Sequence, residues 1–320
     1  MDNHIYVTRT LTDAAMAKVR ELNRPVVVGG EEPPDRATLL RDVAGAGAVV
    51  CTLTERIDAE VLDAAGPGLR VVANTAVGYD NIDVAAATAR GVRVTNTPGV
   101  LDGATADLTF ALILAASRRV LDGDRLIREG TPWIWGPRMM LGTDLSAGAT
   151  LGVVGYGRIG RAVARRARAF DMSVLATPTS SPLTDEDRRG VEFVALPELL
   201  ERSDVVTLHC PLTPETRHLI DAAALRRMKP TAVLVNTARG GIVDEQALIE
   251  ALRSGALAAA GLDVFEGEPR VDPELAKLPN TVLTPHIGSA GTATRERMCG
   301  LSVANAAAVL TGGAPLTPVN

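Results

Sequence analysis

The segment at residues 151–160 constrains the fold of this chain more than any other part of the sequence. An apolar run leads into Gly155, Gly157 and Gly160, spaced as Gly-x-Gly-x-x-Gly, and a helical pattern follows over residues 161–170. In such a unit the first glycine permits a tight turn, the second lets backbone approach a pyrophosphate, and the third lets the helix pack on the strand. Free N–H groups at the helix start, aided by the helix dipole, favour phosphate. Because a strand precedes the glycines and a helix follows them, the segment predicts dinucleotide binding rather than an ordinary glycine turn.

Strand and helix signals alternate along the chain, which is the pattern of βαβ units around parallel sheets. The first hundred residues contain five predicted strands, at 4–8, 25–28, 48–52, 69–73 and 92–95. Predicted helices lie between them, for example at 12–22 and 58–65. A second series contains six predicted strands, at 151–155, 173–176, 205–208, 232–235, 258–262 and 281–284. Six is the number of strands in a doubly wound dinucleotide fold.

A helical run at 292–310 comes too late in the chain to belong to the second series, so we expect it to return to the first domain. The sequence therefore predicts an α/β protein of two doubly wound parallel-sheet domains with a cleft between them. A discontinuous, flavodoxin-like substrate domain would comprise residues 1–98 and 288–320. A Rossmann dinucleotide-binding domain would comprise residues 99–287.

Composition narrows the class of protein further. Hydrophobic residues make up 46% of the chain and charged residues 22%, which is typical of a globular protein. The net charge of −5 provides no basic field for nucleic acid, and no apolar run is long enough for a membrane span. The first residues lack the order of a signal peptide, and the three distant cysteines, Cys51, Cys210 and Cys299, fit a reducing cytoplasm. No cluster of residues has metal-ligand spacing, so we expect no metal.

Three candidate catalytic residues each follow a predicted strand: Arg239, Glu268 and His286. Ligands of open parallel sheets bind beyond the carboxyl ends of the strands, so these side chains should project toward the region of the glycine loop. An arginine offers a planar fork for a carboxylate. A histidine exchanges a proton near neutral pH, and a carboxylate partner orients it. Each residue alone is as well explained as a solvated loop residue, but the three together suit the reduction of a 2-keto acid.

The chain resembles the D-isomer-specific 2-hydroxyacid dehydrogenases, most closely the glyoxylate/hydroxypyruvate reductase branch. The resemblance covers nearly the whole chain and is carried by the glycine loop and by residues 77–83, 209–213, 236–240, 262–266 and 285–289. It implies that Arg239, Glu268 and His286 are the catalytic residues. It also implies that backbone N–H groups of Val77 and Gly78 supplement Arg239 in holding the substrate carboxylate.

The resemblance implies a cofactor site as well, with Thr105 beside the nicotinamide and Asp263 holding its carboxamide. His209, Pro211 and Thr237 match further cofactor contacts. The predicted cofactor-binding residues are Thr105, Gly155, Gly157, Arg158, Ile159, Gly160, Thr179, Ser180, His209, Pro211, Thr216, Thr237, Ala238, Asp263, His286 and Gly288.

The choice of cofactor depends on the end of the second nucleotide-domain strand. Enzymes that use NAD carry an acidic residue there, which binds the ribose hydroxyls and repels a 2′-phosphate. This chain has no Asp or Glu between Val174 and Leu183, but offers hydroxyls that can donate to phosphate, including Thr179 and Ser180. No Arg or Lys follows the strand, although Arg158 adds a charge in the glycine loop. The sequence therefore favours NADP over NAD by a modest margin.

Apolar surface predicts a homodimer. The helix expected at 104–116 is apolar around most of its circumference, more than one core-facing stripe requires. The arm at 120–145 carries Trp133, Trp135, Met139 and Met140 outside any predicted regular element. Such surface usually marks an interface, and a two-fold dimer is the commonest closed assembly. The resemblance suggests that the arm reaches across the dimer and lines the partner's substrate pocket.

The predicted activity is the NAD(P)H-dependent reduction of small 2-keto acids, glyoxylate and hydroxypyruvate, to D-2-hydroxy acids. His286 would protonate the forming alkoxide, and Glu268 would keep the imidazole charged. Dehydrogenases of formate, phosphite or phosphoglycerate on the same scaffold are alternatives. Formate dehydrogenases carry Gln where this chain has Glu268, and phosphoglycerate dehydrogenases often carry a C-terminal regulatory domain, for which this chain ends too early. A dinucleotide-sensing binding protein, like the corepressors that share the fold, is the alternative from another class.

Overall fold

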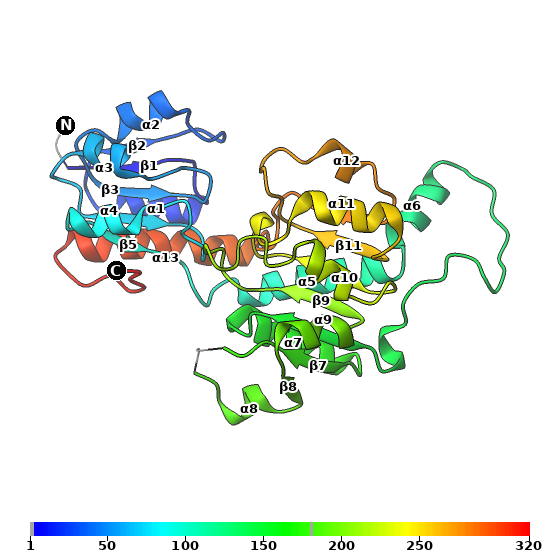
Figure 1. Ribbon diagram of the computed structural model, residues 1–320. Coiled ribbons are helices and arrows are strands. Elements are labelled where there is room, and N and C mark those ends of the chain that lie inside the picture. Colours follow the sequence, from blue (N-terminus) through cyan, green and yellow to red (C-terminus); the bar gives the residue numbers. More distant parts are fainter. Residues whose placement is uncertain (1–2, 180–181) are drawn as a thin grey trace. The chain divides into compact units, whose positions relative to one another are not determined.

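The computed structural model describes residues 3–179 and 182–320, which form two compact units (Figure 1). Unit 1 consists of Met1–Leu101 and Ala290–Asn320, and unit 2 of Asp102–Ser289. Each unit is built around its own parallel sheet with helices on both faces, so the predicted fold class of two doubly wound parallel-sheet domains is confirmed.

The sheet of unit 1 has five strands in the order β2-β1-β3-β4-β5, which is the flavodoxin-like order. Its strands are β1 (His4–Val7), β2 (Val26–Val28), β3 (Ala46–Cys51), β4 (Val71–Asn74) and β5 (Arg93–Thr95). Its helices are α1 (Asp13–Arg20), α2 (Arg36–Val43), α3 (Ala59–Ala65), α4 (Val84–Ala89) and α13 (Thr292–Leu310). Alternate residues of a strand face opposite sides, so Ala48 and Val50 pack toward α1 and α13, whereas Val49 and Cys51 pack toward α2 and α3.

The sheet of unit 2 has seven parallel strands in the order β12-β11-β10-β9-β6-β7-β8. They are β6 (Thr150–Val154), β7 (Ser173–Ala176), β8 (Val191–Phe193), β9 (Val205–Leu208), β10 (Val233–Asn236), β11 (Ala259–Leu262) and β12 (Thr281–Leu283). Six of them, β6 to β11, follow the doubly wound order 3-2-1-4-5-6, and β12 extends the sheet. The predicted number of six was therefore wrong, because the sequence analysis missed β8. This strand has only three residues and lies at the sheet edge.

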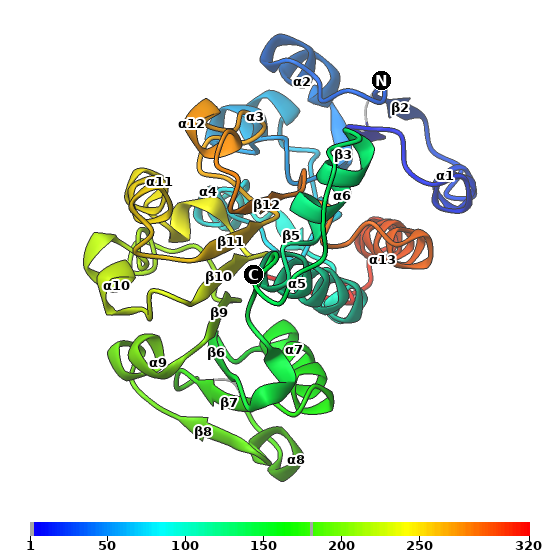
Figure 2. The same cartoon turned by 90° about the vertical axis from the view of Figure 1, so that its right-hand side faces the viewer.

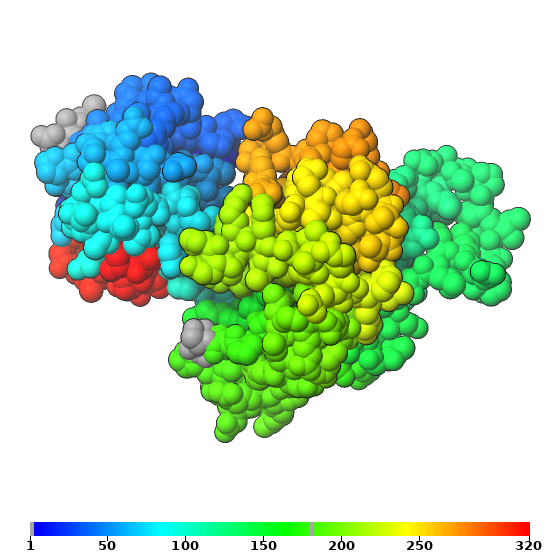
Figure 3. Space-filling model, in the orientation of Figure 1, coloured from blue at the N-terminus to red at the C-terminus, as the bar shows by residue number. Residues whose placement is uncertain are grey.

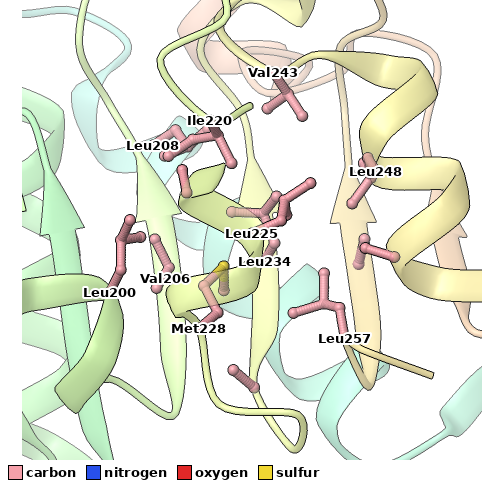
Figure 4. Packing of buried hydrophobic residues seen from close by; sticks show 14 of the residues in the cluster. Leu200, Val206, Leu208, Ile220, Leu225, Met228, Leu234, Val243, Leu248 and Leu257 are labelled. Carbon is pink, nitrogen blue, oxygen red and sulfur yellow. The ribbon is translucent and has the colours of Figure 1, made fainter. Parts of the chain in front are cut away.

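The helices of unit 2 cover both faces of its sheet (Figure 2). On one face lie α9 (Leu196–Arg202), α10 (Ala222–Arg227) and α11 (Glu245–Ser254), and on the other lie α5 (Asp102–Ser117) and α7 (Arg158–Ala169). Leu208, Leu234 and Leu248 belong to the core beneath the first set, which Figure 4 shows from close by. The unit also contains two short helices, α8 (Asp185–Arg188) and α12 (Pro273–Ala276), and two 3-10 turns, Leu145–Ala147 and Gly240–Ile242.

An arm extends from unit 2 after α5, and it stands out in the space-filling view (Figure 3). Its first part is the helix α6 (Val120–Arg128), which the sequence analysis did not predict, whereas Trp133, Trp135, Met139 and Met140 lie outside any helix or strand, as predicted. Trp133 and Trp135 lie in the irregular segment that follows, and both are exposed.

Candidate active site

The three glycines of the loop after β6 differ in what surrounds them. Gly155 has a φ of +94°, and a Cβ there would lie 2.4 Å from the backbone nitrogen of Cys210. At Gly160 a Cβ would lie 2.3 Å from the carbonyl oxygen of Gly155, so only glycine lets α7 approach the strand this closely. At Gly157 nothing lies within 4 Å of such a Cβ. The middle glycine is therefore the one that leaves open space beside the backbone.

The start of α7 presents backbone N–H groups beside this open space. Its N-cap is Gly157, which has no side chain to cap the first turn. Uncapped N–H groups at a helix start suit a phosphate, and the helix dipole adds to the attraction. The loop itself is held by Thr177, whose hydroxyl accepts a hydrogen bond from the Gly155 N–H at 3.0 Å. Arg158 pairs with Asp102 at 3.0 Å, and Ile159 is half-buried.

A second predicted loop, after β9, lies directly against the glycine loop. The His209 N–H donates to the Val154 carbonyl at 2.7 Å, and the imidazole bonds to the Thr207 hydroxyl at 3.0 Å. Burial lowers the pKa of His209 to about 3, so this ring is neutral and acts through its position rather than its charge. The Thr216 hydroxyl donates to the Pro211 carbonyl at 2.6 Å and closes the turn.

Arg239 and Glu268 lie on loops that touch each other. After β10 the side chain of Asn236 accepts from the Ala238 N–H at 3.0 Å and donates to the Arg239 carbonyl at 2.9 Å, which fixes the turn. A Cβ on Gly240 would lie 1.9 Å from the carbonyl carbon of Phe265. The loop after β10 therefore passes directly against the loop that leads to Glu268.

Glu268 and His286 form a hydrogen-bonded pair. His286 Nδ1 lies 2.8 Å from Glu268 Oε2, and Glu268 Oε1 accepts from the Phe265 N–H at 2.9 Å. Burial by itself raises the pKa of Glu268, but the hydrogen bond and charge of His286, the Phe265 N–H and the charge of Arg239 outweigh it, so the net pKa lies below the usual value. The carboxylate therefore stays ionised, and it orients the ring so that Nε2 faces away from it.

Asp263 fixes the backbone around His286. This carboxylate is buried and accepts from the Thr284 hydroxyl at 2.6 Å, the Ile287 N–H at 2.8 Å and the Gly288 N–H at 2.7 Å. The Asp263 carbonyl also accepts from the His286 N–H at 2.9 Å. His286 itself has a φ of +54°, which is uncommon for a residue with a side chain and is maintained here by these bonds.

A row of small residues lies next to this loop. A Cβ on Gly288 would lie 3.5 Å from the Thr105 methyl, so helix α5 meets the His286 loop at Thr105. The Thr109 hydroxyl, one turn further along, bonds to the Thr105 carbonyl at 2.8 Å and to the Thr237 hydroxyl at 2.9 Å. Thr109 links two predicted cofactor-binding residues, and the sequence analysis did not single it out.

Val77 and Gly78 lie in unit 1, in the loop after β4, and both are half-buried. Two asparagines bind this loop. Asn96 Nδ2 donates to the Val77 carbonyl and Asn74 Nδ2 to the Gly78 carbonyl, each at 2.8 Å. The sequence analysis missed both asparagines, because neither belongs to a family motif used there or carries a charge.

Two further predictions concern the edges of the site. Thr179 is half-exposed near the end of the first described range, and Ser180 lies outside the described residues.

Over residues 3–179 and 182–320, no group of three or more His, Cys, Asp or Glu side chains is placed to hold a metal ion. No helix in the same ranges is both long and apolar enough to cross a membrane.

Comparison with known proteins shows the family of this chain. The family model described as D-isomer specific 2-hydroxyacid dehydrogenase, NAD binding domain, matches residues 110–288. A glyoxylate reductase of Korarchaeum cryptofilum is 50% identical over 323 residues, covering 100% of this chain and 96% of the relative. The chain therefore belongs to the D-isomer-specific 2-hydroxyacid dehydrogenase family, as predicted.

Two solved structures are similar over the full length. A protein of Thermus thermophilus matches with a TM-score of 0.92 and 50% identity, covering 99% of this chain and 100% of the other. An NADPH-dependent glyoxylate/hydroxypyruvate reductase of Sinorhizobium meliloti, solved in complex with NADP and malonate, matches with a TM-score of 0.87 and 34% identity. That match covers 100% of this chain and 97% of the other.

Proposed function

We propose that this protein reduces glyoxylate and hydroxypyruvate to D-2-hydroxy acids with NADPH or NADH. The observation that carries the proposal is the His286–Glu268 hydrogen bond of 2.8 Å on loops after β12 and β11, with Arg239 on the adjoining loop after β10. These strands are neighbours in the sheet, so their carboxyl ends present an acid–base pair and a cation together. The reductase names of the relatives support the same reaction.

Arg239 has the task of binding the substrate carboxylate. Its guanidinium offers two parallel N–H donors to a carboxylate, which fixes the orientation of the keto acid as well as its affinity. The N–H groups of Val77 and Gly78 provide further donors for the same carboxylate. In this proposal unit 1 is the substrate domain, with limits close to residues 98 and 288, and unit 2 is the dinucleotide-binding domain.

His286 is the general acid. Because Nδ1 bonds to the Glu268 carboxylate, Nε2 carries the proton that passes to the alkoxide oxygen forming at C2. Glu268 is ionised and holds the ring in place through this hydrogen bond. The bound nicotinamide supplies the hydride that C2 accepts.

The residues of unit 2 fit a dinucleotide. The open space at Gly157 and the uncapped start of α7 match the needs of a pyrophosphate. Thr105, Thr237, Ala238, Asp263 and Gly288 adjoin the His286 loop or the turn before Arg239, where the nicotinamide end would lie. Asp263 already accepts three hydrogen bonds, so we assign it the positioning of His286 in addition to any bond to the carboxamide.

We propose a modest preference for NADPH. After β7 the described chain offers the hydroxyls of Thr177 and Thr179, and Leu175, Ala176 and Pro178 around them carry no charge. Thr177 already accepts from Gly155, and Arg158 already pairs with Asp102. A 2′-phosphate would meet no repulsive carboxylate from β7 to Thr179, but also no dedicated cation there.

We further propose a homodimer formed through the arm. Ile134, Trp135 and Leu141 are 90%, 77% and 67% exposed on one short arm, and large apolar side chains exposed together usually mark an interface. A second copy of the chain is the partner that would cover them. The three cysteines are free thiols, as expected in a reducing cytoplasm, where we place the protein.

A substrate panel tests the function. Glyoxylate, hydroxypyruvate and pyruvate are assayed with NADPH and with NADH, and formate, phosphite and 3-phosphoglycerate with the oxidised cofactors. We expect the reduction of glyoxylate and hydroxypyruvate to dominate, with a higher kcat/KM for NADPH. A kcat/KM about tenfold higher with NADH would overturn the cofactor preference alone. Tight dinucleotide binding without turnover of any substrate would contradict the proposal and favour a dinucleotide-sensing binding protein.

A further inference from the structure

The loop of residues 76–79 in unit 1 has an unusual distribution of hydrogen bonds. Its four successive carbonyls all accept: Ala76 from the Thr97 N–H at 2.9 Å, Val77 from Asn96, Gly78 from Asn74, and Tyr79 from the Ile82 N–H at 3.0 Å. Across the described residues, the N–H groups of Val77, Gly78 and Tyr79 donate to no protein acceptor. The acceptors of this loop are thus occupied, and its donors are available.

Peptide geometry connects these two facts. In a planar trans peptide, the carbonyl of one residue and the N–H of the next point in opposite directions. Asn96 binds the Val77 carbonyl and thereby sets the direction of the Gly78 N–H. Asn74 binds the Gly78 carbonyl and sets the direction of the Tyr79 N–H. Each N–H group therefore points away from the asparagine that fixes it, and successive backbone N–H groups are donors that proteins use to bind anions.

Each asparagine is itself fixed. Asn74 is fully buried, and its Nδ2 also donates to Asn81 Oδ1 at 3.2 Å. The backbone of Asn96 bonds to Thr317 in both directions, with the Thr317 hydroxyl donating to the Asn96 carbonyl at 2.6 Å. Asn305 in turn binds Thr317 through both atoms of its amide, at 2.8 and 3.0 Å. These contacts hold the amide of Asn74 directly and, for Asn96, hold the backbone from which its amide reaches the loop.

We propose that Asn74 and Asn96 are positioning residues, which aim the Gly78 and Tyr79 N–H groups at the substrate carboxylate. This inference rests on the proposed function and adds to it the Tyr79 N–H as a donor. The asparagines do not touch the substrate. They order the loop in advance, so that the donors need no rearrangement when the carboxylate arrives.

Kinetics of matched variants test the proposal. Asn96→Asp and Asn74→Asp keep the side-chain shape but replace the donor by an oxygen. Asn320→Asp makes the same chemical change in unit 1 at an amide that donates to Val92 and Thr88 and does not contact the loop. We expect the KM for glyoxylate and the inhibition constant of oxalate, a carboxylate that cannot be reduced, to rise about tenfold or more in the first two variants. The kcat should fall less than KM rises, NADPH affinity should be unchanged, and Asn320→Asp should behave as wild type.

Asn96→Ala separates loss of the donor from the added charge, because it removes the amide and introduces no carboxylate. It should raise KM in the same direction as Asn96→Asp. The inference would be overturned if both Asn96 variants kept a KM for glyoxylate and an oxalate inhibition constant within about twofold of wild type. In that case the proposed function would still stand, because the wild type would still reduce glyoxylate. Absence of both glyoxylate turnover and oxalate binding in the wild type would remove the proposed function and this inference with it.

Amide NMR tests the wild-type protein directly, which matters because Asn74 is buried and its variant need not fold. The chain has three tyrosines, Tyr6, Tyr79 and Tyr156, so ¹⁵N-tyrosine labelling gives three amide signals. Saturation of the NADPH complex with oxalate should shift the Tyr79 signal and leave that of Tyr6, in the buried strand β1, unchanged. An unmoved Tyr79 signal, with oxalate binding verified by calorimetry, would refute the assignment to Asn74. Labelling of Val–Gly pairs reports Gly78 in the same way, since Val77–Gly78 is one of three such pairs in the sequence.

Discussion

Gly157 and Gly160 should respond to alanine in opposite ways, although only two residues separate them. At Gly157 a methyl group meets no atom within 4 Å, and the φ of −82° is compatible with alanine. The poorer N-cap should cost about 0.5–1 kcal/mol, and the smaller entropy of the unfolded chain should offset about 0.4–1 kcal/mol of it. Unfolding of Gly157→Ala should therefore occur within about 2 °C of the wild-type Tm.

The open space at Gly157 is nevertheless where a pyrophosphate would approach the backbone. A methyl group there should displace one or two charge-assisted hydrogen bonds, so we expect the Kd for NADPH to rise about 10- to 100-fold, or about 1.4–2.7 kcal/mol. Gly160→Ala should behave differently, because its methyl group would overlap the Gly155 carbonyl oxygen at 2.3 Å. Separating α7 from the strand should cost roughly 1–3 kcal/mol of unfolding free energy and lower the Tm by roughly 2–12 °C.

Differential scanning fluorimetry and calorimetric titration with NADPH measure the two effects on the same samples. The reasoning predicts that Gly157→Ala loses affinity without stability and that Gly160→Ala loses stability. A Gly157→Ala protein that binds NADPH within twofold of wild type would refute the assignment of the pyrophosphate to this position. Equal losses of Tm in the two variants would refute the packing argument.

The remaining predictions concern the catalytic residues and the arm. The lowered pKa of Glu268 means that its carboxylate is ionised above the usual glutamate pKa of about 4.3, and that the stability this provides is lost only as pH falls through the lowered value. Glu268→Gln removes the carboxylate that bonds to His286, so the ring is held less firmly and kcat/KM for glyoxylate should fall by about tenfold or more, and a value within twofold of wild type would count against the pairing. Arg239→Lys keeps the charge but loses the bidentate geometry of the guanidinium, so KM for glyoxylate should rise strongly with a smaller fall in kcat. Wild-type kinetics in this variant would mean that other groups hold the carboxylate. Light scattering at micromolar concentration should show a dimer, and replacing Trp135 and Leu141 by serine should weaken it; a wild-type monomer would exclude the dimer.

Much of the fold was predictable because the spacing of apolar residues along the sequence follows which side of a helix or strand is buried. Helix α13 was predicted at its observed limits, 292–310, since its apolar residues from Cys299 to Leu310 recur at helical spacing and pack against the sheet and α1. Strand β8 was missed because it has only three residues, none of them fully buried, and so short a segment shows no clear alternation of apolar and polar residues. Helix α6 was missed for a different reason: Val120, Leu121 and Ile127 are exposed within the chain, so its apolar residues do not report an internal core.

The site was predictable as far as side chains with their own chemistry lie at strand ends. Arg239, Glu268 and His286 follow β10, β11 and β12, and the strand-end rule places them together without any knowledge of their contacts. The conformation of His286 was not predictable, because its positive φ depends on hydrogen bonds that Asp263, 23 residues away in sequence, accepts from the His286 loop.

Residues that act through the backbone left no signal in the sequence. Thr177 holds the glycine loop by accepting from Gly155, and Asn74 and Asn96 bind carbonyls of the Val77 loop. Such contacts depend on which backbone groups a turn leaves unpaired, and that is known only once the chain is folded. Arg158 shows the same limit for a charged residue, because its partner could not be read from the sequence. The sequence offered it as a phosphate ligand, and the structure pairs it with Asp102, on another helix.

Turnover of glyoxylate by wild type and by His286→Ala, with NADPH affinity measured on both, tests the central claim most directly. The claim is that His286, oriented by Glu268, protonates the alkoxide formed from a 2-keto acid. It predicts that the wild-type protein oxidises NADPH in step with the formation of glycolate. His286→Ala should bind NADPH with nearly unchanged affinity, and its kcat should fall by about 10²- to 10⁴-fold. Wild-type turnover in His286→Ala, or no glyoxylate-dependent oxidation of NADPH or NADH by the wild type, would contradict the account.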